Sequence, residues 1–178
     1  MNNWLLAGLI TVALALPPAQ QSPYTEHTQR PIKALSEEQV AGYLAGEGMG
    51  YALAAELNDY PGPKHVLELA TELQLSGQQE AQVTAAFTEM QADAQALGAR
   101  LVDLERQLDE AFAQRSITEA ELGERLVELG RVGGELRLAH LRAHLETTAL
   151  LSAAQIQHYG VLRGYSDHGD HGEHQHHQ

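Results

Sequence analysis

The sequence predicts an all-α protein built on a long antiparallel helical hairpin with short flanking helices. Three observations support this fold class. Four helix starts carry the same capping signature, and a heptad spacing of apolar residues runs through the middle of the chain. No segment alternates apolar and polar residues as a half-buried strand does. A length of 178 residues suits one domain with a modest core.

The first twenty residues have the pattern of a signal peptide. Residues 4–16 form an apolar run of 13, which suits a signal-peptide core and is short for a membrane span. Ala13 and Ala15 then place small residues in the spacing that precedes a cleavage site. An N-terminal anchor or a buried helix is the alternative, because no Lys or Arg precedes the apolar run. We expect residues 1–20 to direct export and to be removed, with no stable membrane insertion afterwards.

Proline and glycine predict where the chain departs from helix. Residues 17–31 are polar and proline-rich, which predicts a flexible N-terminal arm over residues 21–34 before a helical domain of residues 35–165. Inside that domain, helix breaks are predicted at the GEGMG stretch of residues 46–50 and at the YPGP stretch of residues 60–63. A short helix of roughly residues 66–73 should follow the second break.

Four helices begin at a capping box, in which a Ser or Thr is followed three residues later by Gln or Glu. The two side chains satisfy two backbone N–H groups at the helix start, and each box should contribute about 1 kcal/mol. The four pairs are Ser36 with Gln39, Ser76 with Gln79, Thr118 with Glu121, and Ser152 with Gln155. Hydrophobic staples accompany three of them: Leu35 with Val40, Ile117 with Leu122, and Leu151 with Ile156.

Two of these helices are long and should pack on each other. On the first, apolar residues recur in steps of three and four from Val83 to Phe112, which is close to a heptad seam. The short turn at residues 113–117 returns the second helix antiparallel, with Phe112 opposite Leu122.

A second apolar stripe remains on the second long helix. Leu138, Leu141 and Leu145 lie three and four residues apart, so they share one face. Either the short flanking helices or a second subunit must cover this face. We expect a homodimer, because thin flanking helices would leave a sizeable apolar surface in water.

The hairpin is flanked by two copies of an L-S-x-x-Q motif: Leu75, Ser76 and Gln79, then Leu151, Ser152 and Gln155. This arrangement resembles the Spy/CpxP family, whose mark is a pair of L-T-x-x-Q motifs around a long helical hairpin. The resemblance covers about residues 63–165, with Ser in place of Thr. It implies a cradle-shaped dimer in the periplasm. It also implies an ATP-independent envelope-stress chaperone that binds unfolded or misfolded clients, or alternatively a protein that binds, buffers or senses heavy metals.

Composition argues against other classes of function. With 24 acidic and 11 basic residues the formal charge is −13, so no basic patch is available for a nucleic acid partner. The chain has no Cys, which excludes thiolate ligands, thiol catalysis and disulfides. No Ser-His-Asp, G-x-S-x-G or H-E-x-x-H arrangement is evident, so we expect neither an enzyme nor an organic cofactor.

His140 and His144 form a candidate metal site on the second long helix. They lie one turn apart on one face, so they can chelate a single ion. His140 falls on the apolar seam, where an imidazole needs a partner. The alternative interpretation is a hydrogen-bonded core histidine at 140 and a surface histidine at 144.

Other side chains could complete this site. The antiparallel register predicts that Met90 lies near the histidine pair and that Glu89 and Asp93 lie within reach of it. His65, with Glu68 on the next turn of its own helix, could contribute from another element.

The last stretch of the chain, residues 166–178, predicts a disordered His-rich tail. Imidazoles and carboxylates suit divalent zinc, nickel or copper, but a tail without rigid geometry should select poorly among them. The alternative interpretation is a solubilising acidic segment. The candidate ligands of the tail are His168, His171, His174, His176 and His177.

Overall fold

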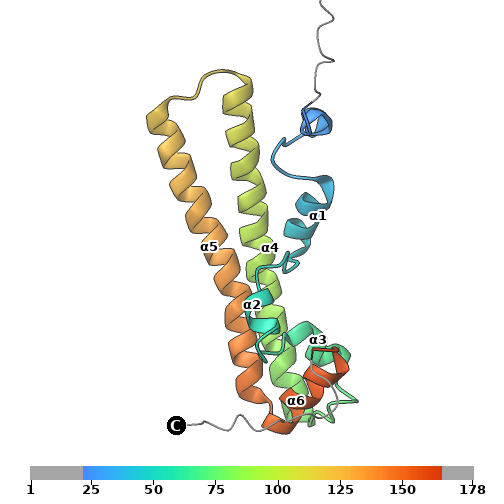
Figure 1. Ribbon diagram of the computed structural model, residues 1–178. Coiled ribbons are helices and arrows are strands. Elements are labelled where there is room, and N and C mark those ends of the chain that lie inside the picture. Colours follow the sequence, from blue (N-terminus) through green and yellow to red (C-terminus); the bar gives the residue numbers. More distant parts are fainter. Residues whose placement is uncertain (1–21, 166–178) are drawn as a thin grey trace, which may run out of the picture.

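The computed structural model describes residues 22–165, and all regular structure in that part of the chain is helical (Figure 1). The helices are η1 (Thr25–Gln29, a 3-10 helix), α1 (Glu37–Ala45), α2 (Leu53–Glu56), α3 (Pro63–Glu68), α4 (Gly77–Ala113), α5 (Glu119–Leu150) and α6 (Ala153–Leu162). The long helices α4 and α5 form the hairpin, and α1 lies along α4. The 3-10 helix η1 lies toward the hairpin turn, whereas α2, α3 and α6 gather toward the opposite end. The predicted all-α hairpin with short flanking helices is confirmed. The predicted signal peptide and His-rich tail lie outside the described residues.

All four predicted capping boxes are present. At Ser36, Ser76, Thr118 and Ser152 the side-chain hydroxyl accepts the backbone N–H of the third helical residue, whose side chain accepts the N–H of the cap. The predicted break in GEGMG is also confirmed, because α1 ends at Gly46 with a left-handed φ of 71°. The long helices therefore begin where local sequence chemistry places them.

Two predictions differ in detail from the structure. The helix predicted at residues 66–73 instead begins at Pro63, whose fixed φ suits a first helical position, and ends at Glu68. Turns then carry the chain to the cap of α4, with Gln74 in the left-handed region at φ 51°. The described part of the predicted arm contains η1, and its Ile32 is buried. Lys33 also bonds Asp109 of α4, so this segment is attached to the hairpin.

The two L-S-x-x-Q motifs contact each other at the base of the hairpin. The amide of Gln79 donates to the carbonyl of Leu150, the last residue of α5, at 2.9 Å. The amide of Gln155 donates to the carbonyl of Leu73 at 3.1 Å. The two glutamines also bond each other, at 2.9 and 3.3 Å. Each motif thus caps its own helix and also donates to a backbone carbonyl just before the other motif. This reciprocal contact gives a physical reason why the L-S-x-x-Q motif occurs twice.

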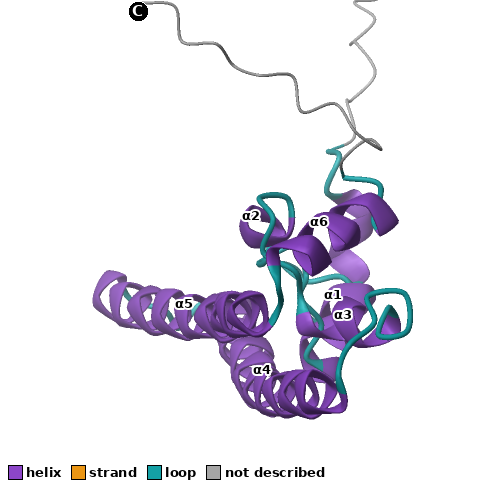
Figure 2. Cartoon of the chain, turned by 90° about the horizontal axis from the view of Figure 1, so that it is seen from below, coloured by secondary structure: helices purple, strands orange, loops and turns teal. Residues whose placement is uncertain are grey.

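The core has two apolar clusters along the hairpin. The basal cluster contains Val66, Leu73, Val83, Leu151 and Tyr159, from α3, α4 and α6 and their flanking turns. The upper cluster contains Ala94, Leu101, Leu104, Val132 and Leu136, from α4 and α5. On α4 about three turns separate Val83 of the basal cluster from Ala94 of the upper cluster, and the candidate site occupies that interval. Viewed along the hairpin, the short helices gather on one side of it (Figure 2).

Candidate functional site

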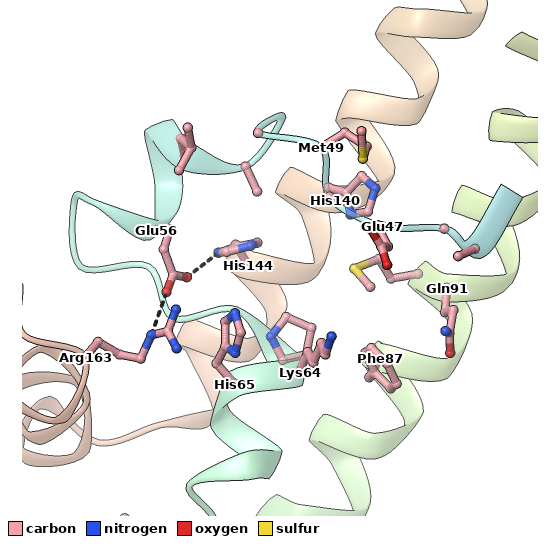
Figure 3. Close-up of a pocket in the computed structure, with 18 of the residues that line it drawn as sticks. Glu47, Met49, Glu56, Lys64, His65, Phe87, Gln91, His140, His144 and Arg163 are labelled. Atoms are coloured by element: carbon pink, nitrogen blue, oxygen red, sulfur yellow. Dashed lines mark ion pairs between the residues drawn. The ribbon is translucent and has the colours of Figure 1, made fainter. Parts of the chain in front are cut away.

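A pocket of about 690 Å³ lies between the two apolar clusters (Figure 3). The hairpin supplies two of its walls, with Phe87, Met90 and Gln91 from α4 and His140 and His144 from α5. The glycine-rich segment after α1, helix α2, the start of α3 and the residues that follow α6 complete the lining. The pocket therefore joins segments that are distant in sequence, as ligand sites commonly do.

His140 is a buried polar side chain of this pocket with an unsatisfied ring nitrogen. It is only 3% exposed, and its Nε2 atom is buried without a hydrogen-bond partner among residues 22–165. Burial, and then repulsion from His144, lowers the pKa of His140 below its ordinary value of 6.5. The imidazole is therefore neutral at neutral pH, which is the form that binds metals. The interpretation of a hydrogen-bonded core histidine does not account for the lone Nε2.

His144 is buried and oriented, rather than lying on the surface. Its Nδ1 donates to the carbonyl of Tyr60 at 2.7 Å and lies 3.8 Å from a carboxylate oxygen of Glu56. This bond favours the tautomer with the proton on Nδ1 and leaves the Nε2 lone pair available. Gly62 makes the arrangement possible, because a Cβ there would stand 2.8 Å from His144 Cε1. Such orientation of a ring by its second nitrogen is usual for metal-binding histidines.

Glu56, at the end of α2, is a buried carboxylate that the sequence interpretation missed. One oxygen accepts from the hydroxyls of Tyr159 at 2.5 Å and Tyr165 at 3.0 Å and lies 3.5 Å from Arg163 Nε. The other oxygen accepts the backbone N–H of Gly62 at 3.2 Å. Glu56 thus ties α2 to α6 and its following turn. A four-residue helix gave no periodic signal for it, so only the packing of α6 shows its role.

The sequence predicts that His65 and Glu68 contribute to the histidine site. His65 lines the pocket, but Glu68 does not. His65 Nδ1 lies 2.7 Å from Glu68 Oε2, so the exposed glutamate orients the histidine from outside the lining. This bond lowers the pKa of Glu68 below its usual range. Glu68 therefore bonds to His65 but does not itself line the pocket.

The predicted carboxylates of α4 face elsewhere. Glu89 and Asp93 line a separate small crevice, together with Arg142 and Glu146 of α5. Met90 lines both cavities, in agreement with the predicted register. The carboxylates that do line the histidine pocket are Glu47 and Glu56, contributed by the segment after α1 and by α2. The register of an antiparallel helix pair predicts which residues of the two helices lie at the same level. It does not predict toward which side of the helix pair each side chain points.

The histidines and carboxylates of the pocket do not converge on one point. Within residues 22–165, no group of three or more His, Asp or Glu side chains is placed to hold a metal ion together. His140 and His144 lie one turn apart on α5 and both line the pocket, so they share one face of that helix. Completing a coordination sphere around them needs other donors or a movement of the glycine-rich segment.

Comparison with models of protein families, with curated proteins and with solved structures finds no match to this chain. In the part of the chain that the structure describes, no helix combines the length and the apolar character needed to cross a membrane.

Proposed function

We propose that this chain is a periplasmic metal-binding protein of the Spy/CpxP type, which buffers or senses zinc, nickel or copper in the pocket between α4 and α5. The observation that carries the proposal is the buried, neutral His140, whose Nε2 has no partner among the described residues. An unsatisfied buried polar group costs about 1–3 kcal/mol, so selection tolerates it where a ligand repays the cost. The periplasmic assignment rests on the signal-like sequence of residues 1–20.

The surroundings of His140 support a transition metal rather than an organic ligand. His144 is oriented by Tyr60 so that a lone pair remains on Nε2, and His65 lines the same pocket from α3. Imidazole nitrogens suit zinc, nickel and copper, while magnesium and calcium prefer oxygen. A bound ion would join α5 to the short helices across the pocket. Its binding free energy would therefore appear as added stability of the fold.

The test uses the full-length chain in which the five tail histidines are replaced by Asn, so that only the folded part can respond. We expect its melting temperature to rise when zinc, nickel or copper is added, because a ligand at 100 times its Kd adds about 2.7 kcal/mol. The rise should fade in acid, because a protonated imidazole cannot bind a metal ion. His140→Leu or His144→Leu should abolish the rise.

A matched control for these variants is His158→Leu, because His158 lies on α6, is exposed and does not line the pocket. That variant should keep the full response to metal. A tail-substituted protein whose melting temperature ignores every metal of this group would contradict the proposal. His140 would then be a core residue, and the chaperone function would become the better explanation.

A second candidate function is an ATP-independent chaperone for unfolded or misfolded clients, and one observation favours it. Val127, Leu138 and Leu145 share a face of α5 and are 74%, 51% and 58% exposed. Exposed apolar side chains on one helix face can bind client segments. Val127→Glu together with Leu145→Glu should then abolish protection of an unfolded client in an aggregation assay. Protection that survives these changes would exclude this face as the client site.

A further inference from the structure

The histidine pocket also contains sulfur. The chain has three methionines, at positions 1, 49 and 90, and both Met49 and Met90 line this pocket. Met90 projects from α4, between the two long helices, whereas Met49 comes from the glycine-rich segment after α1. Two thioethers beside two imidazoles make a donor set that differs from the oxygen-rich sites of hard cations.

Met49 is held in an unfavourable backbone conformation. Its φ of 43° lies in the left-handed region, which residues with a Cβ rarely adopt and which costs of order 1 kcal/mol. Gly48 and Gly50 flank Met49, and a glycine adopts a left-handed φ without the steric penalty that a Cβ brings. The structure nevertheless places the methionine at the strained position, and Figure 3 shows its side chain beside His140. Asp59, Gln74 and Arg115 share this conformation in turns, so the strain at Met49 supports the inference only together with the position of its side chain.

The bare backbone of Gly42 accommodates this side chain. A Cβ built on Gly42 of α1 would overlap Met49 Sδ and would stand 3.3 Å from Glu47 Oε2. Met49 and Glu47 therefore occupy one corner of the pocket, next to His140 in Figure 3. An alanine at Gly42 would push the sulfur out of this corner.

Most carboxylates near the pocket compete poorly as ligands, and Glu47 is the exception. Glu56 already accepts from Tyr159, Tyr165 and the Gly62 N–H, so its lone pairs are largely used. Glu89 and Asp93 face the other crevice. The donors that remain in the pocket are therefore the imidazoles and the two thioether sulfurs, with the carboxylate of Glu47 as the one oxygen ligand that competes with them.

On the basis of the proposed function, we infer that the metal of this pocket is copper in its monovalent form, held by His140 and His144 with the thioether sulfurs of Met49 and Met90. Zinc favours a tetrahedral set of imidazole, carboxylate and thiolate ligands, and the described histidines and carboxylates do not converge to provide one. Monovalent copper is soft, prefers thioether and imidazole donors, and accepts a low coordination number. The site should therefore prefer Cu(I) to zinc and nickel.

The experiment measures Cu(I) and zinc affinities of the full-length chain with its tail histidines replaced by Asn. Cu(I) is titrated without oxygen against a chromophoric chelator, with ascorbate as reductant, and zinc is titrated against a fluorescent indicator. Cu(I) should bind more tightly than zinc. Met49→Leu and Met90→Leu should each weaken Cu(I) binding by about tenfold or more, the scale on which changes near a metal act, and should leave zinc binding unchanged. Phe87→Leu, which changes the pocket wall without removing a donor, should affect neither metal.

X-ray absorption of the Cu(I)-loaded protein gives a second readout that needs no variant. Because the chain has no Cys, sulfur scattering at the copper edge can come only from methionine. Zinc binding tighter than Cu(I), or a copper spectrum without sulfur, would overturn this inference. If either metal still requires His140 and His144, the proposed function would survive that result. Metal binding that is indifferent to both histidines would instead remove the proposed function itself.

Discussion

Gly98 lies in the interior of α4, where alanine is ordinarily the more stable residue. Here a Cβ would overlap the backbone carbonyl of Tyr43, because α1 crosses α4 at this point. Gly98→Ala should therefore force the two helices apart and reduce the free energy of unfolding by about 1–3 kcal/mol. Denaturant titration followed by circular dichroism measures the change.

The matched substitution is Gly130→Ala on α5, where a Cβ would meet no atom within 4 Å. Gly130 is exposed and has ordinary helical surroundings, so the alanine should raise the free energy of unfolding by about 0.5–1 kcal/mol. The same substitution thus has opposite signs at the two positions. Equal effects at both would mean that α1 does not pack against α4 as described.

Glu105 on α4 illustrates how burial couples stability to pH. Burial raises the pKa of this carboxyl above its ordinary value of 4.5. The folded state therefore binds the proton more tightly than the unfolded state, and its stability falls as the pH rises through the raised pKa. Glu105→Gln should raise the melting temperature at neutral pH and should have little effect below the ordinary pKa.

The pKa of Glu121 is shifted in the opposite direction to that of Glu105, so Glu121 serves as the comparison. Hydrogen bonds from Thr118 lower the pKa of its carboxyl, so Glu121→Gln should lower the melting temperature at neutral pH and lose its effect in acid. Thermal melts of both variants at the two pH values check the signs. Two glutamine variants that shift in the same direction would show that burial does not govern Glu105.

At this residue scale the sequence predicted the imidazoles better than the carboxylates. His140 and His144 were found because their spacing on one long helix fixes their common face. Glu56 was missed because it lies on a four-residue helix whose position depends on contacts with Tyr159 and Tyr165, more than a hundred residues later. Met49 was missed as well, because no pattern in the sequence reports its contact with Gly42.

At the scale of helices, the paired motifs explain why Gln rather than Glu follows two of the caps. Gln155 uses its oxygen in its own capping box and its amide nitrogen to reach Leu73 and Gln79. Gln155→Glu should keep the box, lose the donor and leave the Leu73 carbonyl without its partner. The expected cost is about 1–3 kcal/mol of unfolding free energy.

Gln39→Glu is the matched control, because Gln39 serves only its own box at Ser36 among the described contacts. A carboxylate there still accepts the cap N–H and favours the start of α1, so the change should be neutral or should stabilise by about 0.3–1 kcal/mol. Denaturant titrations of the two variants, side by side, test the contact between the motifs. Similar small effects at both positions would show that the contact adds no stability.

The helices themselves were predictable to the extent that their signals are local. Capping boxes and heptad spacing act within a few residues, and they located α1, α4, α5 and α6. The bounds of α3 were wrong because its start depends on Pro63 and its end on the path toward the cap at Ser76. Short helices without a cap are set by the tertiary contacts around them, and these are absent from a local pattern.

For the whole molecule, the main unexplained surface is the second stripe of α5. The short helices gather on one side of the hairpin (Figure 2), and none of them buries Leu138 or Leu145, which are 51% and 58% exposed. We propose that a second copy of the chain covers this stripe in a homodimer. Each half-exposed leucine would then gain about 1 kcal/mol, and a two-fold axis would count every such contact twice.

Leu138→Glu combined with Leu141→Glu should therefore yield monomers, because two buried carboxylates at the centre of a symmetric interface would repel their copies and lose their hydration. Sedimentation velocity at micromolar concentration measures the change, with wild type sedimenting as a dimer. Leu44→Glu on α1 replaces a leucine of equal exposure, 50%, away from the stripe and should leave the dimer intact. The monomeric variant should still gain stability from metal, since a single chain supplies the whole pocket. A wild-type chain that sediments as a monomer would remove the dimer proposal and leave the stripe free for client segments.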